Sequence, residues 1–175
     1  MLLNVLELAL KKASFEETFP PQSIDIRDTN FRQTKDLHIT GEAQLLPGTN
    51  EIQIRGHVNG TLEGECDRCL ATAPLVIDRD YDLFYRSASE DLDGTEKVLE
   101  RDETEVGYYE GEELATKDVL QEQVLLWIPM HWVCKEDCKG ICPACGVNRN
   151  REACKCQSEA ADDRWSALRD FRPER

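Results

Sequence analysis

Aromatic residues, positive charge and long apolar runs are all scarce in this sequence. Aromatics make up 7% of its 175 residues, so stacking platforms for single-stranded nucleic acid are few. Its 21 basic residues face 35 acidic ones, a net charge of −14, which disfavours loose attraction to RNA phosphates or to anionic membranes. Any contact with RNA would therefore be local.

A membrane-spanning or secretory segment is missing as well. The longest apolar run, 124–130, is far shorter than the roughly 20 residues that cross a bilayer. Residues 1–8 have no basic residue ahead of their leucines, and Glu7 interrupts them, so no signal peptide is visible. We therefore expect a cytoplasmic protein without membrane contact, and its 40% hydrophobic content suffices for one core.

Alternation of apolar and polar residues predicts a β-rich body. Extended chain is expected at 15–19 and 37–46, whereas residues 1–12 fit a helix and a strand equally and stay unassigned. The segment 51–62 alternates with one face formed by Ile52, Ile54 and Val58, and a second strand-like segment runs from Leu70 to Tyr85. Joined as a hairpin, the two strands would place Cys66-Asp67-Arg68-Cys69 at its tip.

Negative charge is concentrated in residues 89–113, which hold eleven acidic and two basic side chains, a net charge of −9. Such a segment is either a solvated insertion or a docking surface for a basic partner. It includes a short predicted strand at 106–109. The clearest helix then begins at Thr116, a suitable N-cap, and ends before Pro129.

These elements predict an α+β fold. We expect a β-rich antiparallel sheet with one long covering helix and a cysteine-rich, zinc-binding C-terminal module. The predicted divisions are a body at 1–130 with the acidic insertion 89–113 and the helix at about 116–128, a module at 131–157, and a tail at 158–175. Trp165, Leu168 and Phe171 would form a short helix in the tail that docks on the body.

Eight cysteines fall into four close pairs, which are Cys66 and Cys69, Cys134 and Cys138, Cys142 and Cys145, and Cys154 and Cys156. A disulfide framework is typical of small secreted chains, and no export signal is visible here. Zinc prefers four tetrahedral soft ligands, so four pairs predict two structural zinc sites. The Cys142-Pro143-Ala144-Cys145-Gly146 sequence has the composition of a zinc knuckle, in which Pro143 presets the turn and Gly146 takes a positive φ.

Four pairs can be divided between two sites in three ways. We favour one local site of the last four cysteines, because its closing loop is short, and a second site that joins Cys66 and Cys69 to Cys134 and Cys138. Spacing alone leaves an iron–sulfur cluster open. His131 is a possible substitute ligand, although packing is the commoner role for such a histidine. Thiol–disulfide exchange is disfavoured, since no helix follows the Cys66 to Cys69 pair.

The order of these motifs resembles the YceD family, the large ribosomal RNA subunit accumulation proteins. The resemblance is carried by CDRCL at 66–70, QVLLWIPM at 123–130, CKEDCKGICPACGVNRN at 134–150 and DRWSAL at 163–168. It implies a bacterial or plastid-type factor needed for large-subunit ribosomal RNA to accumulate, with no established enzymatic activity. Members of this family are often encoded beside a small zinc-containing protein of the large ribosomal subunit.

Three functional hypotheses follow. The first is a non-catalytic ribosome biogenesis factor that supports 23S ribosomal RNA accumulation by binding a basic ribosomal protein or a precursor of the large subunit. The second is direct binding of 23S ribosomal RNA through the hairpin tip and the patch 149–155, which contains no aromatic residue. The third, a thiol redox enzyme or a metal-dependent hydrolase, is disfavoured because four thiolates close the coordination shell. No catalytic residue is assigned.

Overall fold

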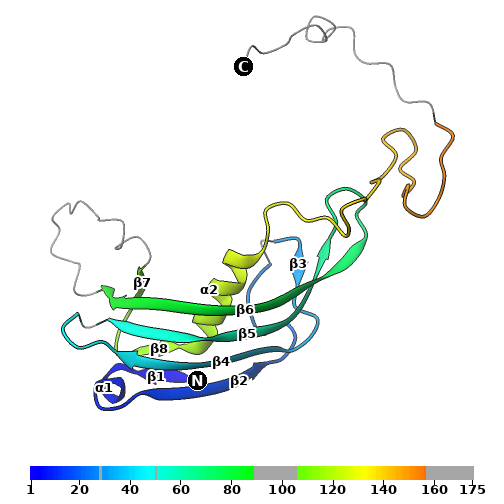
Figure 1. The fold of residues 1–175 in the computed structure, drawn as a ribbon. Helices are drawn as coiled ribbons and strands as arrows, with labels where there is room; N and C mark the ends of the chain where they lie inside the picture. The colour runs from blue at the N-terminus through cyan, green and yellow to red at the C-terminus, as the bar shows by residue number, and fades with distance from the viewer. Residues whose placement is uncertain (28, 50, 89–105, 157–175) are drawn as a thin grey trace, which may run out of the picture.

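The computed structural model describes residues 1–27, 29–49, 51–88 and 106–156 (Figure 1). These ranges contain ten elements. In chain order they are β1 (Leu2–Asn4), α1 (Val5–Leu8), β2 (Ala13–Phe19), β3 (Phe31–Arg32), β4 (Leu37–Leu45), β5 (Ile52–Glu65), β6 (Thr72–Ser87), β7 (Val106–Tyr109), β8 (Glu113–Ala115) and α2 (Thr116–Trp127).

The main sheet has the order β2-β4-β5-β6-β7, and β3 also pairs with β5. The strands up to β6 are antiparallel, but β7 pairs with β6 in parallel. The predicted antiparallel sheet is therefore confirmed up to β6, and the sheet is mixed at this edge. Eighteen residues, 88–105, separate the two strands in the sequence, and a parallel pair requires a connection of about a dozen residues or more.

The predicted hairpin and strands are confirmed. β5 pairs with β6 without interruption from Ile52 opposite Tyr85 to Glu65 opposite Thr72, and the turn between them contains the first two cysteines. The three side chains assigned to one face of β5 are fully buried, and the predictions at 15–19, 37–46 and 106–109 correspond to β2, β4 and β7.

Two glycines opposite each other in the sheet make room for two aromatic rings on its inner face. Phe15 pairs with Gly41, Gly41 with Gly56, and Gly56 with Tyr81. A Cβ atom on Gly56 would lie 1.9 Å from the Thr40 carbonyl oxygen and 2.5 Å from the Tyr81 hydroxyl oxygen. The Tyr81 hydroxyl donates to the same Thr40 oxygen at 3.0 Å, so this row packs as one unit across four strands.

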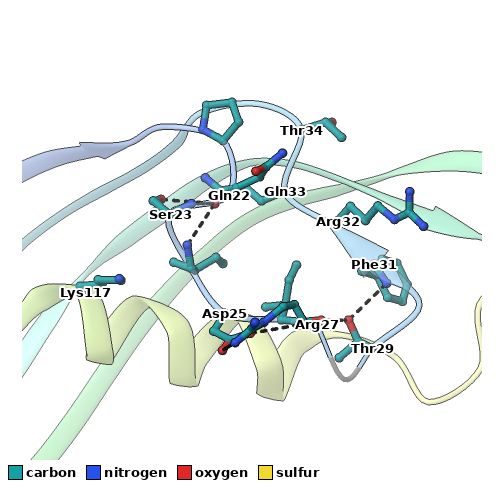
Figure 2. Close-up of a pocket in the computed structure, with 13 residues that line it drawn as sticks. Gln22, Ser23, Asp25, Arg27, Thr29, Phe31, Arg32, Gln33, Thr34 and Lys117 are labelled. Carbon is teal, nitrogen blue, oxygen red and sulfur yellow. Dashed lines mark hydrogen bonds and ion pairs between the residues drawn. The ribbon is translucent and has the colours of Figure 1, made fainter.

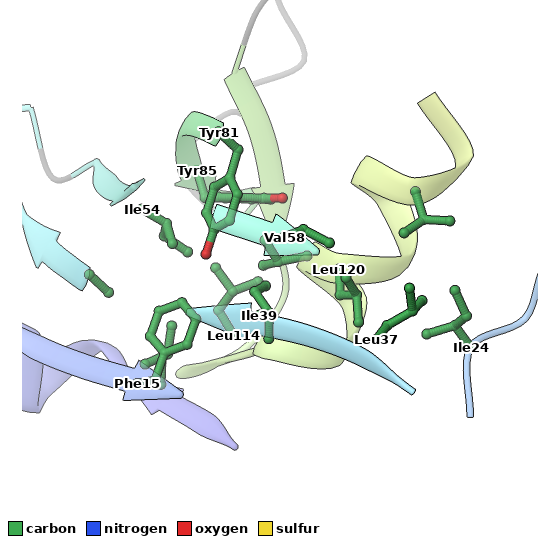
Figure 3. Close-up of a cluster of buried hydrophobic side chains, with 14 of the residues drawn as sticks. Phe15, Ile24, Leu37, Ile39, Ile54, Val58, Tyr81, Tyr85, Leu114 and Leu120 are labelled. Atoms are coloured by element: carbon green, nitrogen blue, oxygen red, sulfur yellow. The ribbon is translucent and has the colours of Figure 1, made fainter. Parts of the chain in front are cut away.

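The hydrophobic core lies between the inner face of the sheet and α2, as Figure 3 shows. Val119, Leu120 and Val124 of α2 are at most 1% exposed. The prediction of one long covering helix is nevertheless wrong, because α2 has twelve residues. At 1.5 Å per residue it is about 18 Å long, whereas sixteen-residue β6 reaches about 53 Å at 3.3 Å per residue.

Thr116 begins the helix, as predicted, but it does not cap it. Ala115 occupies the N-cap position without a side-chain hydrogen bond. The Thr116 hydroxyl is instead used in tertiary contacts with the Met1 carbonyl oxygen and the Glu17 carboxylate. These contacts tie the start of α2 to the N-terminal residue and to β2. β1, which follows Met1, pairs with β8 in a separate two-stranded sheet.

Two predicted features lie outside the described residues. These are the greater part of the acidic segment, at 89–105, and the docking helix in the tail at 158–175. Within the described ranges, neither helix is long and apolar enough to pass through a membrane.

Candidate metal centres

The first group of thiols forms where the β5–β6 turn meets the segment after α2. Cys66 follows directly on β5, and its N–H donates to the Ala71 carbonyl oxygen at 3.0 Å. Leu70 donates back to the Cys66 carbonyl at 2.8 Å and has a φ of 57°, so the turn is tight. This turn directs the side chains of Cys66 and Cys69 to one side, where they meet Cys134 and Cys138.

Sulfur–sulfur distances in this group fit a tetrahedral centre. The Cys66 and Cys138 sulfurs are 3.8 Å apart, and the Cys69 and Cys134 sulfurs are 3.7 Å apart. Four sulfurs at about 2.3 Å from a zinc ion lie about 3.8 Å from one another. Cys66 is 0% exposed, and Cys69 and Cys138 are 5% exposed, so an ion held here would be shielded from water.

The thiols of this group differ in how readily they ionise. Burial opposes ionisation of Cys66, but backbone N–H groups donate to its sulfur and lower its pKa to about 6. The Gly140 N–H is the main cause of a lowered pKa at Cys138. Desolvation and the neighbouring sulfurs raise the pKa of Cys134 to about 12. A divalent cation would offset both the desolvation of the thiolates and the repulsion between them, and so would favour ionisation of all four.

Asp67 connects the hairpin tip to the second half of this group. Its carboxylate accepts a hydrogen bond from the Trp132 N–H at 2.7 Å and pairs with His131 at 2.7 Å. Its own N–H donates to the Trp132 carbonyl at 2.9 Å. His131 therefore contacts a carboxylate and lies outside both thiol groups, so the alternative of His131 as a ligand has no support in the geometry.

The second group gathers the last four cysteines, whose sulfurs all lie within 4.8 Å of one another. The Cys142 N–H donates to the Val147 carbonyl and the Gly146 N–H to the Cys142 carbonyl, both at 2.8 Å. Gly146 has a φ of 74°, as the knuckle pattern predicts. The backbone N–H groups of Cys145 and Ala144 lower the pKa of Cys142 to about 6.

The remaining members of the second group are more exposed than Cys142. Cys145 and Cys156 are exposed, in contrast to buried Cys142. The neighbouring sulfurs of Cys145 and Cys142 raise the pKa of Cys156 to about 12. As in the first group, the donor set is four sulfurs, and it suits a soft or borderline divalent cation.

A small hydrogen-bond network joins the two groups. The Asn150 side chain donates to the Cys138 sulfur at 3.4 Å and to the Asn148 side-chain oxygen at 3.0 Å. The Asn148 side chain donates to the Cys69 carbonyl at 3.4 Å. The two asparagines of the second group's loop therefore contact both halves of the first group.

The structure thus collects all eight predicted cysteines into two groups of four, with the division favoured from the sequence. Metal ligation by them stays a prediction. Sequence reasoning gave no role to Asp67, Asn148 or Asn150. Their signal was present in retrospect, because each is a short polar residue within a few positions of a cysteine pair, where partners that orient ligands are common.

A separate polar cavity of about 890 Å³ lies between the loop 20–34 and the start of α2 (Figure 2). Gln33 is 3% exposed and organises this loop. Its amide oxygen accepts from the Ser23 N–H at 3.0 Å, and its amide nitrogen donates to the Phe19 carbonyl at 2.8 Å. The charged side chains that line the cavity are Asp25, Arg27, Arg32 and Lys117.

A β-sheet body that carries two four-thiol groups defines a cysteine-rich protein able to hold two metal ions. The chain belongs to the YceD family, described as the large ribosomal RNA subunit accumulation protein, whose model matches residues 54–172. The match extends from β5 into the tail and includes all eight cysteines. The family is named for a role in ribosomal RNA accumulation and not for an enzymatic activity.

Similar proteins occur in mycobacteria. Uncharacterized proteins of Mycobacterium bovis and Mycobacterium tuberculosis are each 31% identical to this chain over 118 residues, which make up 67% of this chain and 54% of the relative. The chain therefore spans about half the length of these curated relatives. No solved structure matches it.

Proposed function

We propose that this protein is a non-catalytic ribosome biogenesis factor in the cytoplasm. It supports accumulation of large-subunit (23S) ribosomal RNA by binding a basic ribosomal protein or a precursor particle that contains one. The observation that carries this proposal is the family match over residues 54–172. The charge of −14 agrees with a basic protein partner, since complementary potentials speed association and exclude wrong partners.

We further propose that each four-thiol group holds one structural zinc ion. Zinc fits because each group offers four sulfurs within 4.8 Å of one another, and the two distances of 3.8 and 3.7 Å in the first group match tetrahedral spacing. When bound, the metal would crosslink segments that have no large apolar core of their own. In this interpretation 131–157 is a metal module on the body 1–130, and 158–175 is a tail.

Affinity purification from cells tests the ribosomal role. A tagged chain captured at moderate salt should bring down a basic ribosomal protein or a large-subunit precursor, and depletion of the protein should lower 23S ribosomal RNA relative to 16S. Capture of neither, together with normal 23S levels after depletion, would contradict the proposal.

Metal analysis of the purified protein tests the zinc sites separately. We expect two zinc ions per chain, and one after either Cys66→Ser or Cys145→Ser. The first substitution should lower the stability of the body, because it opens a crosslink between the hairpin tip and the segment after α2. The second should leave the body's unfolding unchanged. Iron in place of zinc, or no metal at all, would overturn this assignment.

Direct contact with RNA is a second candidate, favoured by the charge of the polar cavity. Three of its four charged lining residues are basic in a strongly acidic chain. In the described part of the chain, no carboxylate lies within ion-pair distance of Arg32 or Lys117. Binding of short 23S fragments that weakens at least fivefold in Arg32→Glu/Lys117→Glu, but not in Lys11→Glu/Lys12→Glu, would support this candidate. Equal loss in both double variants would indicate general charge attraction only.

A further inference from the structure

Strand β6 has one open edge over most of its length. It pairs with β5 along fourteen positions, from Thr72 to Tyr85. On the opposite side β7 pairs with it only at residues 84–87. Among the residues that the structure describes, no strand pairs with the outer edge of β6 from 72 to 83, which is about 40 Å of strand at 3.3 Å per residue.

The backbone groups that face this edge can be identified from the hairpin register. Cys66 lies opposite Ala71 at the turn, and its N–H donates to the Ala71 carbonyl oxygen at 3.0 Å, as in a hydrogen-bonded position of the ladder. Such positions recur at every second residue of an antiparallel ladder, so the odd-numbered residues of β6 bond to β5. The even-numbered residues therefore direct their N–H and C=O groups outward. Pro74, which has no N–H to lose, occupies one of these outward positions, as proline does on edge strands.

The same even-numbered positions carry a row of acids on the exposed face of the sheet. The side chains of Asp78, Asp80 and Asp82 are 71%, 91% and 51% exposed. His57 contacts the first two at 2.8 Å, and Arg55 contacts Asp82 at 3.1 Å. Among the described residues the contacts of each acid come from β5, where Gln53 also donates to Asp82 at 2.8 Å, and the opposite side of the row faces the open edge.

We propose that the open edge of β6 binds an extended, basic segment of a partner protein as an added antiparallel strand. A strand paired at this edge would place its alternate side chains about 5 Å from the acids in Cβ–Cβ distance. Lysine or arginine at every second position would then meet Asp78, Asp80 and Asp82 in turn. Main-chain hydrogen bonds supply affinity and the acidic row supplies specificity. This inference rests on the proposed function, because it gives the contact made with the basic partner.

Acidic side chains on an edge strand also have a protective role, since charge discourages pairing with other strands. The two roles differ in what they predict for a basic strand. If the acids only protect the edge, a basic strand is attracted by their charge but forms no backbone hydrogen bonds with β6. The experiment therefore has to separate charge attraction from backbone pairing.

The probe is a heptapeptide of alternating threonine and lysine, measured by calorimetry against the full-length, metal-loaded chain. Asp80→Ala removes the carboxylate but keeps the outward N–H, whereas Asp80→Pro removes both. We expect Asp80→Pro to bind the peptide about tenfold more weakly than Asp80→Ala, the loss of one backbone hydrogen bond. A peptide of the same charge with N-methyl groups on its lysine backbone nitrogens should bind neither the native chain nor Asp80→Ala measurably.

The N-methylated peptide keeps the test decisive even if Asp80→Pro is poorly folded. Equal binding of the two peptides would show charge attraction alone and overturn the proposal, as would no binding of the first peptide. Pairing of two copies through β6, seen as a dimer that the peptide does not dissociate, would also overturn it. If cells yield a basic ribosomal partner that binds native protein and Asp80→Pro equally, the edge inference fails while the proposed function stands.

Discussion

Replacing Asp67 tests whether the hairpin tip is positioned by its carboxylate. In Asp67→Ala the Trp132 N–H loses a charged acceptor at 2.7 Å, and such bonds contribute about 1.5–3 kcal/mol. In the ion pair between Asp67 and His131 the histidine side chain is 65% exposed, so the pair adds at most about 1 kcal/mol. We expect a combined loss of about 2 kcal/mol.

This loss falls mainly on the metal-bound state, because Asp67 holds Cys134 and its neighbours against the turn that carries the first two cysteines. A cost of about 2 kcal/mol corresponds to about 30-fold weaker metal binding, within the 10- to 100-fold range of residues that orient metal ligands. The assay is competition for zinc with a chromophoric chelator. All variants also carry Cys142→Ser and Cys145→Ser, so that the assay measures zinc binding by the first group alone.

Asp137→Ala is the matched control. Asp137 lies inside the loop between two cysteines of the same group, but it is 77% exposed and pairs only loosely with Lys135 at 3.5 Å. Its removal should change zinc affinity less than threefold. Asp67→Asn, which keeps an acceptor oxygen without the charge, should fall between the native protein and Asp67→Ala. Native affinity in Asp67→Ala would refute the reasoning.

Two further predictions concern the sheet. Gly56→Ala should lower the free energy of unfolding by about 3 kcal/mol in urea titrations, because its Cβ would lie 1.9 Å from the Thr40 carbonyl oxygen; an unchanged midpoint would contradict the close approach of these strands. Hydrogen bonds to Asp80 and then Asp78 raise the pKa of His57 above 6.5, the ordinary pKa of histidine. This contact therefore stabilises the fold fully below pH 6.5, and progressively less as the pH rises through the pKa of His57 in the folded protein. The difference in free energy of unfolding between the native protein and His57→Gln should therefore shrink between pH 6 and pH 8. A difference that grows over this range would contradict the prediction.

Much of the fold was predictable because its central elements are local. The β5–β6 hairpin is defined by alternation on each side of a tight turn, and the turn is where the first cysteine pair occurs. The strand at 106–109 and the start of α2 at Thr116 also have local signals. Cysteine spacing likewise limited the thiol groups to three divisions, of which the shortest closing loop favoured the observed one.

The errors concern contacts between distant residues. Threonine is a residue type favoured at N-caps, but the hydroxyl of Thr116 contacts the Met1 carbonyl oxygen and the Glu17 carboxylate. No local sequence pattern reveals these contacts. The parallel pairing of β7 likewise depends on the path of a long connection. The extent of sheet that α2 covers was overestimated, because apolar residues at helical spacing predict burial and do not show how much of a sheet the helix covers.

The two-residue strand β3 has a mechanical consequence for the metal groups. β4 ends its pairing with β5 at Gly60, so beyond this point the hairpin is a narrow ribbon that would twist and bend easily. There Phe31 of β3 pairs opposite Gly64, and its ring lies 6.0 Å from that of Trp132. The pairing of β3 and the contact between Phe31 and Trp132 stiffen the hairpin where it is no longer paired with β4. A displacement of the cysteine-rich end is thereby transmitted to the sheet, so the metal groups and the sheet move together as one rigid arm.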